Sequence, residues 1–283
     1  MIYQEKTYPR VYDLGHEPTT PWVRFRLTLQ RVTTQAWYQL LSLKAQDNLT
    51  FMNFGYSPES PGLNPLELES ADEINRDTIQ LYHRVASAVS LRGKDVLEVG
   101  SGRGGGAAFV RKYLQPRSMT GVDFCGRAVA FCKRRHTMDG LAYKRGDAEA
   151  LPFPSGSFDA VVNVESCHCY RSVDRFLGEV SRVLRGNGNL LFADVGPQLY
   201  TDALRTQMER SGLSIVEEED IGAGVVRALA LNSVRHRASI HSEVPVGLRT
   251  VFSNFSGIEG TPVFEAIRSG EWKYVRYVLR KPA

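Results

Sequence analysis

Three closely spaced glycines follow an acidic, otherwise apolar run in the segment DVLEVGSGRG from Asp95 to Gly104. Gly100, Gly102 and Gly104 lack a Cβ, so the backbone can adopt left-handed angles there and approach a ligand closely. A helix that starts near residue 105 would offer unpaired N–H groups to the same ligand. The segment therefore predicts a strand that breaks into a turn around a nucleotide-like ligand.

The glycine spacing does not identify that ligand. Gly100, Gly102 and Gly105 also satisfy the dinucleotide pattern, so a nicotinamide enzyme and a user of S-adenosylmethionine remain open on this count. Glu98 stands two residues before the first glycine, where its charge would oppose a pyrophosphate. This acid favours a cationic ligand end without phosphate, and therefore S-adenosylmethionine.

Two further acids follow two further apolar runs. Asp123 ends MTGVD, where its carboxylate can accept hydrogen bonds from both ribose hydroxyls of an adenosine; the alternative is an N-cap for the next helix. Phe124 is a cofactor-binding candidate beside it. In GDAEALPF, Asp147 or the N–H of Ala148 could reach the adenine edge, although Asp147 alone would be a turn aspartate.

The segment NVESCHCY, residues 163 to 170, follows the next apolar run, where a methyl acceptor would meet the cofactor. His168 is the one side chain of this segment that titrates near neutral pH, so it could take a proton from an acceptor hydroxyl or amine. The alternative is a histidine that only shapes the loop. Glu165 is predicted to contact the cofactor or to position His168, and Asn163 to contact the cofactor.

The pattern of runs around these residues predicts an α/β fold. Short β-rich runs alternate with helical stretches, which is typical of a doubly wound sheet. The predicted strands cover residues 94–99, 118–123, 141–145, 158–164, 188–194, 213–219 and 272–279. The predicted helices between them cover residues 105–114, 126–136, 172–184 and 199–210. The interruption at 221–270 predicts a mainly helical lid before the last strand.

The N-terminal third predicts helices outside the sheet. A helix is predicted over residues 21–44, then a Pro-rich loop over 48–71 that could fold over a pocket, then a helix over 72–90. We expect residues 1–90 to form this helical segment, 91–220 the cofactor-binding core, 221–270 the lid and 271–283 the final strand. The first helix also predicts a homo-oligomer.

Composition excludes several classes of protein. The 35 basic and 31 acidic residues give a formal charge of +4, spread along the chain, which argues against nucleic-acid binding. No apolar run approaches the roughly 20 residues that span a bilayer, so we expect a cytoplasmic protein. The four cysteines fit neither a disulfide framework nor a usual zinc spacing, and no metal is expected.

The chain resembles the class I S-adenosylmethionine-dependent methyltransferases over about residues 94–194. The motifs that carry the resemblance are EVGSGRG from Glu98, the ribose acid Asp123, GDAEALPF from Gly146, SFDAV from Ser157 and VLRGNGNL from Val183. The last usually reads LRPGG, so its turn departs from the family pattern. The resemblance implies a Rossmann-like, seven-stranded, mostly parallel sheet with S-adenosyl-L-methionine as cofactor.

A closer resemblance extends to the actinobacterial phthiotriolone and phenolphthiotriolone dimycocerosate methyltransferases. It rests on FMNFGY from Phe51, LYHR from Leu81, NVESCHCY from Asn163 and GIEGT from Gly257. The resemblance implies O-methylation of a small lipophilic or aromatic natural product in secondary metabolism. The alternatives are a carbon or nitrogen methyltransferase of alkaloid or terpenoid tailoring, with or without coupled cyclisation, and a cofactor-binding protein without transfer.

Overall fold

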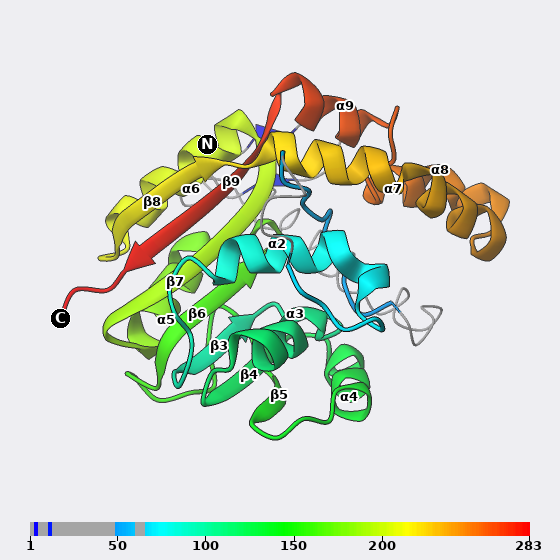
Figure 1. Cartoon of the computed structure of the whole chain (residues 1–283). Coiled ribbons are helices and arrows are strands. Elements are labelled where there is room, and N and C mark those ends of the chain that lie inside the picture. The colour runs from blue at the N-terminus through cyan, green and yellow to red at the C-terminus, as the bar shows by residue number, and fades with distance from the viewer. Residues whose placement is uncertain (1–2, 5–10, 13–48, 60–65) are drawn as a thin grey trace.

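The computed structural model describes residues 3–4, 11–12, 49–59 and 66–283 (Figure 1). The helix predicted over residues 21–44 lies outside the described residues, and so does the subunit contact predicted through it. Two short strands, β1 (Tyr3–Gln4) and β2 (Val11–Tyr12), pair antiparallel in a separate sheet. All other described strands belong to one seven-stranded sheet.

The large sheet has the order β5-β4-β3-β6-β7-β9-β8, and only β9 runs antiparallel to its neighbours. This confirms the predicted seven-stranded, mostly parallel sheet. Its strands are β3 (Asp95–Val99), β4 (Ser118–Asp123), β5 (Leu141–Arg145), β6 (Phe158–Val164), β7 (Leu184–Pro197), β8 (Ser214–Asp220) and β9 (Trp272–Arg280).

β7 is longer at both ends than the predicted strand over 188–194. Its carboxyl half continues to Pro197 because it pairs with β9 along nine consecutive residues. At its start, Leu184 pairs with Phe158 before the register shifts, and Asn187 adopts a left-handed φ of 63° there. The unusual glycine and asparagine turn of the sequence is therefore an irregularity within the strand.

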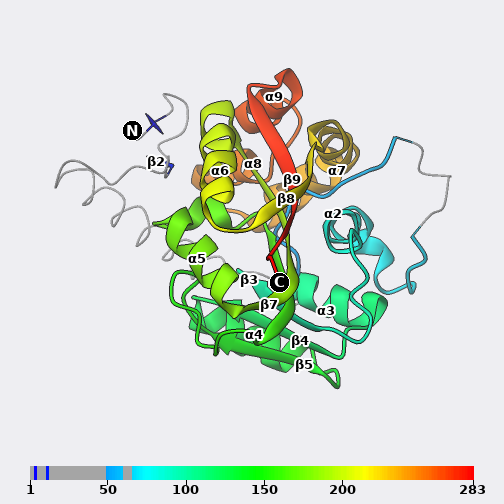
Figure 2. The ribbon, with the colours of Figure 1, turned by 90° about the vertical axis from the view of Figure 1, so that its left-hand side faces the viewer.

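Helices cover both faces of the sheet (Figure 2). On one face lie α5 (Val173–Val183) and α6 (Gln198–Arg210), which contribute to one buried apolar cluster. The other cluster contains residues of α2 (Arg76–Ala86), α3 (Gly105–Phe109), α4 (Gly126–Arg135), α7 (Gly222–Glu243) and α9 (Pro262–Ser269). α3 continues as a π-helical turn over Val110–Leu114.

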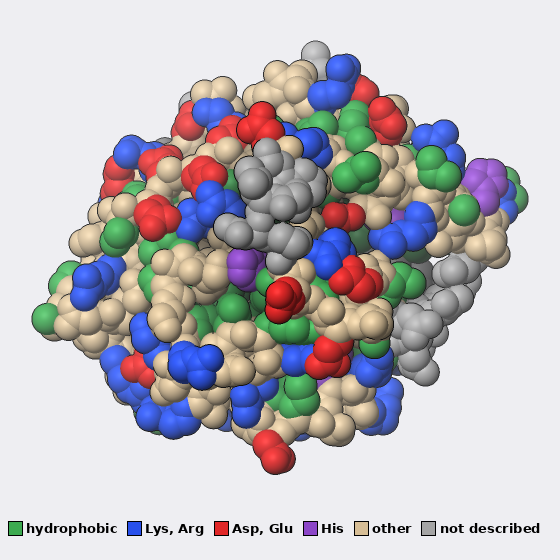
Figure 3. All heavy atoms as spheres, in the orientation of Figure 1, with side chains coloured by type: hydrophobic (Ala, Val, Ile, Leu, Met, Phe, Trp, Pro, Cys, Tyr) green, Lys and Arg blue, Asp and Glu red, His purple; other side chains and the backbone are tan. Residues whose placement is uncertain are grey.

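The predicted insertion before the last strand is helical. It consists of α7, a 3-10 turn at Val246–Leu248, α8 (Arg249–Phe255) and α9, all between β8 and β9. None of the helices in the described ranges is long and apolar enough to cross a bilayer. Figure 3 shows basic and acidic side chains interspersed over one face of the molecule, so no single charge dominates the coloured part of that face.

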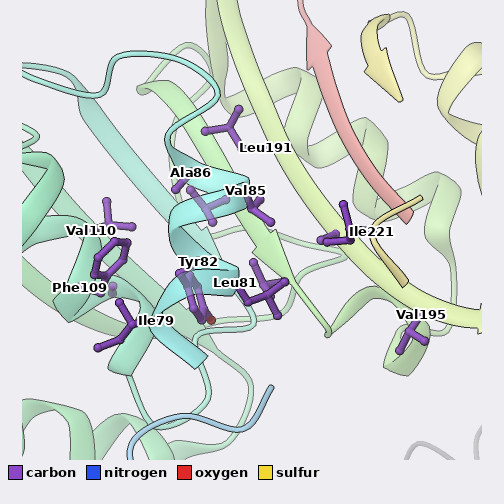
Figure 4. Close-up of a cluster of buried hydrophobic side chains, with 14 of the residues drawn as sticks. Ile79, Leu81, Tyr82, Val85, Ala86, Phe109, Val110, Leu191, Val195 and Ile221 are labelled. Carbon is purple, nitrogen blue, oxygen red and sulfur yellow. The ribbon is translucent and has the colours of Figure 1, made fainter. Parts of the chain in front are cut away.

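α2 shows how the helices attach to the sheet. Its apolar residues recur at helical spacing, and Leu81 and Val85 are completely buried (Figure 4). They belong to the same cluster as Phe109 of α3 and Leu191 of β7. This packing holds α2 over the sheet, beside the end of β3.

We expect Leu81→Ala to lower the free energy of unfolding by about 2–5 kcal/mol, because truncation of a fully buried leucine loses transfer free energy and leaves a cavity. Ile74→Ala is the control, since the Ile74 side chain is 65% exposed and its loss should change stability by less than about 0.5 kcal/mol. Urea unfolding followed by circular dichroism measures both. Equal losses would contradict this packing.

Candidate active site

The site lies where the direction of the sheet's strand order reverses. From β3 the chain proceeds outward through β4 and β5, then returns to β6 on the other side of β3. Ligands of such sheets bind at this point, at the carboxyl ends of the strands. A cavity of about 160 Å³ lies there, and its wall includes residues that follow β3, β4 and β6.

The predicted glycine turn forms one wall of this cavity. The N–H groups of Gly100 and Ser101 donate to the Val122 carbonyl at 2.8 and 2.9 Å, which ties the end of β3 to β4. Gly100 has a φ of 79°, and a Cβ there would meet Ser166 Oγ at 2.3 Å. The turn therefore requires glycine both for its backbone angles and for its contact with the end of β6.

Asp123 lies at the end of β4 and lines the cavity, as Phe124 does. Its Oδ2 accepts the Gly102 N–H and its Oδ1 the Cys125 N–H, both at 2.8 Å. The N-cap of α4 is Cys125, so Asp123 itself does not cap that helix. Burial raises the pKa of Asp123 to about 6. A ligand hydroxyl that donates to the carboxylate would act in the opposite direction, because it stabilises the ionised form.

Asp147 and Ala148 line the cavity beyond β5. Asp147 Oδ1 also accepts the Glu149 N–H at 3.0 Å, as expected of a turn aspartate. The two interpretations of Asp147 are therefore compatible, because the turn itself forms part of the cavity wall. The N–H of Ala148 belongs to that same turn.

Glu98 and Gly104 lie behind the cavity wall. Glu98 is 1% exposed, and its Oε1 accepts the hydroxyl of Tyr82, a wall residue, at 2.7 Å. Burial raises the pKa of Glu98 to about 8. Gly104 packs against Tyr143 instead, since its carbonyl accepts the Tyr143 hydroxyl at 2.8 Å. The predicted contact of Glu98 with a cofactor would thus be indirect, through the side chain of Tyr82 from α2.

Two buried polar atoms near the turn remain available. Glu98 Oε2 and Ser101 Oγ have no hydrogen-bond partner among the described residues, and Ser101 lines the cavity. Buried polar atoms without partners are uncommon in folded proteins. The glycine cradle, Asp123 and Ser101 Oγ fit a polar ligand that carries a ribose and a charged amino-acid end, and Glu98 lies behind them.

Asn163 does not reach the cavity wall. Its side chain is fully buried, and Nδ2 lies within hydrogen-bond distance of the Val99 carbonyl (2.9 Å), Ser166 Oγ (2.8 Å) and the Tyr170 hydroxyl (2.9 Å). Its two hydrogens can serve two of these three acceptors at a time. Ser166 and Tyr170 do line the cavity. Asn163 therefore joins the ends of β3 and β6, and any effect on a cofactor passes through those two neighbours.

Glu165 lines the cavity in a backbone conformation that is uncommon for a residue with a side chain, at a φ of 48°. Its Oε1 accepts the N–H of Phe54 at 2.8 Å and the hydroxyl of Tyr274 at 2.6 Å. Burial raises the pKa of Glu165 to about 7. This carboxyl thereby connects the loop over residues 49–59 to the last strand.

His168 lies next to the cavity, in a short 3-10 turn whose Cys169 belongs to the wall. Its Nδ1 lies 2.5 Å from Oδ1 of Asp194, and its N–H donates to Asp194 Oδ2 at 2.8 Å. Sequence reasoning missed Asp194. The signal was present as an acid in the apolar run LLFADVG, which predicts a buried carboxylate at a strand end.

Comparisons with known proteins show the family of this chain. A family model described as a methyltransferase domain matches residues 97–192. The phthiotriol/phenolphthiotriol dimycocerosates methyltransferase of Mycobacterium leprae (strain TN) is 40% identical over 87% of this chain and 90% of that protein. The chain belongs to the S-adenosylmethionine-dependent methyltransferases. A fatty-acid O-methyltransferase of Mycolicibacterium smegmatis is 37% identical over 84% of this methyltransferase and 85% of its own length.

A solved structure shows the same fold. It is a geranyl diphosphate C-methyltransferase from Streptomyces coelicolor A3(2), in complex with Mg²⁺, geranyl diphosphate and S-adenosyl-L-homocysteine. Its TM-score with this methyltransferase is 0.64 at 16% identity, with 94% of this chain and 100% of that chain covered. The cofactor of this methyltransferase is S-adenosyl-L-methionine, as predicted from the glycine turn and its acids.

We expect Asp123→Ala to weaken the binding of S-adenosylhomocysteine by roughly 10- to 100-fold, because hydrogen bonds to a charged carboxylate contribute about 1.5–3 kcal/mol. Asp139→Ala removes an exposed acid just before β5, at the opposite edge of the sheet, and should leave the affinity unchanged. Calorimetric titration measures both. The same dissociation constant in both variants would show that Asp123 does not bind the cofactor.

We also expect Glu98→Gln to change how stability depends on pH. Burial raises the pKa of Glu98 from its ordinary 4.5 to about 8, so between these values the folded protein keeps a proton that the unfolded chain releases. Rising pH therefore destabilises the wild type through Glu98, by at most about 1.4 kcal/mol per pH unit.

Glu98→Gln should lose this contribution, whereas Glu259→Gln, at an exposed position, should keep it. Unfolding free energies from urea titrations between pH 5 and 8 provide the measurement. Parallel stability curves for the wild type and Glu98→Gln would show that Glu98 is ionised in the folded protein.

Proposed function

We propose that this methyltransferase methylates an oxygen atom of a small lipophilic natural product, with His168 as the general base. The observation that carries the proposal is the buried contact of His168 with Asp194, one residue from the cavity wall. The printed names of the relatives, a fatty-acid O-methyltransferase and the dimycocerosates methyltransferases, support an acceptor of lipid type.

The apolar part of the cavity wall is consistent with an apolar methyl acceptor. Phe51, Met52 and Val164 contribute apolar wall, and Tyr170 adds an aromatic ring. The apolar residues of α7 lie elsewhere: Val225 and Leu229 are buried in the core cluster, and Leu231 is 70% exposed. The apolar wall therefore comes from the loop at 49–59 and from the end of β6 more than from α7.

The bound cofactor supplies a methyl group that its sulfonium already activates for direct displacement. The residues of this chain then have three tasks. Asp123 and the glycine turn hold the cofactor, Glu165 and the loop at 49–59 close the site against water, and His168 takes the proton of an acceptor hydroxyl. Orientation and exclusion of water contribute most, because the protein forms no covalent bond in such a transfer.

We propose that the loop at 49–59 and α7 form the lid of the site. The loop is fixed by backbone hydrogen bonds, from Tyr56 N to the Asp77 carbonyl at 2.9 Å and from Ser57 N to the Gly224 carbonyl at 3.0 Å. These contacts join it to α2 and to the start of α7. The division at residues 90, 220 and 270 stays a prediction, as do oligomerisation and a cytoplasmic location.

His168→Ala should slow methyl transfer by about 10²-fold or more, because a positioned general base typically contributes that factor. His241→Ala changes an exposed histidine of α7 and should leave the rate unchanged. The assay follows S-adenosylhomocysteine formation by mass spectrometry, with hexadecanol as the oxygen acceptor, because its hydroxyl must lose a proton. Calorimetry with S-adenosylhomocysteine checks that both variants retain the cofactor site.

Equal rates for His168→Ala and the wild type would contradict a general base at this position. Transfer only to acceptors that lack a hydroxyl or carboxyl group would contradict O-methylation and favour the carbon or nitrogen target. Cofactor binding without turnover on any acceptor would contradict methyl transfer altogether.

A further inference from the structure

α7, the 3-10 turn at Val246–Leu248 and α8 form a helical arm that extends to the right-hand end of the molecule in Figure 1. Apolar side chains occur all round α7, a pattern that is typical of a helix with protein on every side. One side of α7 has such a cover, since Val225, Ala228 and Leu229 are buried. The opposite side faces outward.

The outward side of the helical arm is apolar. Leu231 and Val234 lie three residues apart, on one side of α7, and are 70% and 81% exposed. The turn and α8 add the exposed side chains of Val246, Leu248 and Val251. Half of the exposed large apolar side chains of the described residues therefore lie between residues 231 and 251. Such a concentration is typical of an interaction surface.

The charge of the helical arm is positive. Residues 222–255 contain four arginines and one acid. The arginines donate to backbone carbonyls, and the ion pairs among the described residues involve other side chains. The accepting carbonyls are those of Ser57, Ile74, Glu259 and His241, for Arg227, Arg235, Arg237 and Arg249 respectively. Neighbouring carboxylates therefore do not neutralise these charges. Figure 3 shows basic and hydrophobic side chains together at this end of the molecule.

α4 carries a second group of basic side chains, and Figure 1 places α4 and α8 towards the same side of the molecule. Arg127, Lys133, Arg134 and Arg135 of this helix are exposed. They belong to residues 103–145, which hold ten basic and two acidic residues. This stretch corrects the expectation that the charge is spread evenly along the chain.

We propose that the outward side of the helical arm, together with the basic side chains of α4, binds the surface of an anionic lipid bilayer. The exposed leucines and valines enter the boundary between headgroups and acyl chains, and the arginines and lysine bind anionic headgroups. The apolar side chains favour a bilayer over a nucleic acid, whose phosphates attract only the basic ones. Repulsion between the arginines of two identical arms disfavours a second copy of this chain.

The helical arm also contacts the loop at 49–59. A Cβ on Gly224 of α7 would meet the ring of Tyr56 at 2.1 Å, and one on Gly257 after α8 would meet Phe54 at 3.6 Å. The same loop contributes Phe51 and Met52 to the cavity wall. Binding through the arm would therefore bring the cavity close to a bilayer in which a lipophilic acceptor dissolves. This goes beyond the proposed function, because it concerns where the enzyme meets its acceptor.

Flotation of vesicles with the full-length chain measures this binding without cofactor or acceptor. The vesicles contain phosphatidylcholine alone, or phosphatidylcholine and phosphatidylglycerol in equal amounts. We expect binding to the anionic vesicles to be at least about tenfold tighter and to weaken with salt, because each basic side chain near the surface contributes about fivefold. Equal affinity for both kinds of vesicle, or binding to neither, would overturn the proposal.

A double variant, Leu231→Ser with Val234→Ser, tests the apolar side of the helical arm. We expect its affinity for the anionic vesicles to fall about tenfold or more, because less apolar area leaves water on binding. Val216→Ser is the matched control, since Val216 is 58% exposed in β8, at the edge of the sheet, and should bind like the wild type. Wild-type affinity in the double variant would overturn the proposal.

Arg134→Ala tests the contribution of α4, and we expect about fivefold weaker binding to the anionic vesicles. Arg210→Ala removes the same charge from an exposed position at the end of α6 and should leave the affinity unchanged. Equal affinities of these two variants would contradict the contribution of α4.

Sedimentation velocity tests a second copy of this chain as the partner. We expect the same size for the wild type and the Leu231→Ser, Val234→Ser variant. A wild-type dimer that dissociates in this variant would assign the helical arm to self-association and overturn the proposal. The proposed function fails separately, through full activity of His168→Ala, because vesicle binding involves neither the cofactor nor the acceptor.

Discussion

The site depends on the attachment of one turn to the neighbouring strand. Three successive N–H groups after β3 donate to the end of β4: those of Gly100 and Ser101 to the Val122 carbonyl, and that of Gly102 to the Asp123 carboxylate. Positive φ values at Gly100 and Gly102 allow the turn to fold back so sharply. The same bonds orient Asp123 and bring the turn against Ser166, so one local constraint sets one wall of the cavity.

Burial of the acids around this turn gives the site its electrostatic character. The pKa values of Glu98, Asp123 and Glu165 are all raised, in each case chiefly by burial. Asp123 and Glu165 line the cavity, where they can accept donors from a ligand with hydroxyls and a cationic end, because those donors compensate the loss of solvent. Asp194 differs, since protein donors already surround its oxygens and direct it to His168.

Much of the fold followed from local patterns. The alternating runs predicted the sheet and its helices, because strands buried on both faces are short and apolar and the helices between them are amphipathic. The glycine turn and Asp123 were found in the same way, at the ends of such runs. Contacts between elements that are distant in the sequence could not be predicted from these patterns. Nothing local to Glu165 indicates that Phe54 and Tyr274 hold it, because one lies in the loop at 49–59 and the other in β9. Nothing local to His168 indicates Asp194, because β7 lies beside β6 only through the order of the strands.

A crystal structure of the complex with S-adenosylhomocysteine tests the central claim, that the strand ends of β3, β4 and β6 form one cofactor and acceptor site. We expect ribose hydroxyls within hydrogen-bond distance of Asp123, adenine beside Asp147 and Ala148, and a sulfur atom that faces the side of the cavity that carries Glu165 and Cys169. A ligand bound elsewhere, or a sulfur atom directed away from Glu165 and His168, would contradict it.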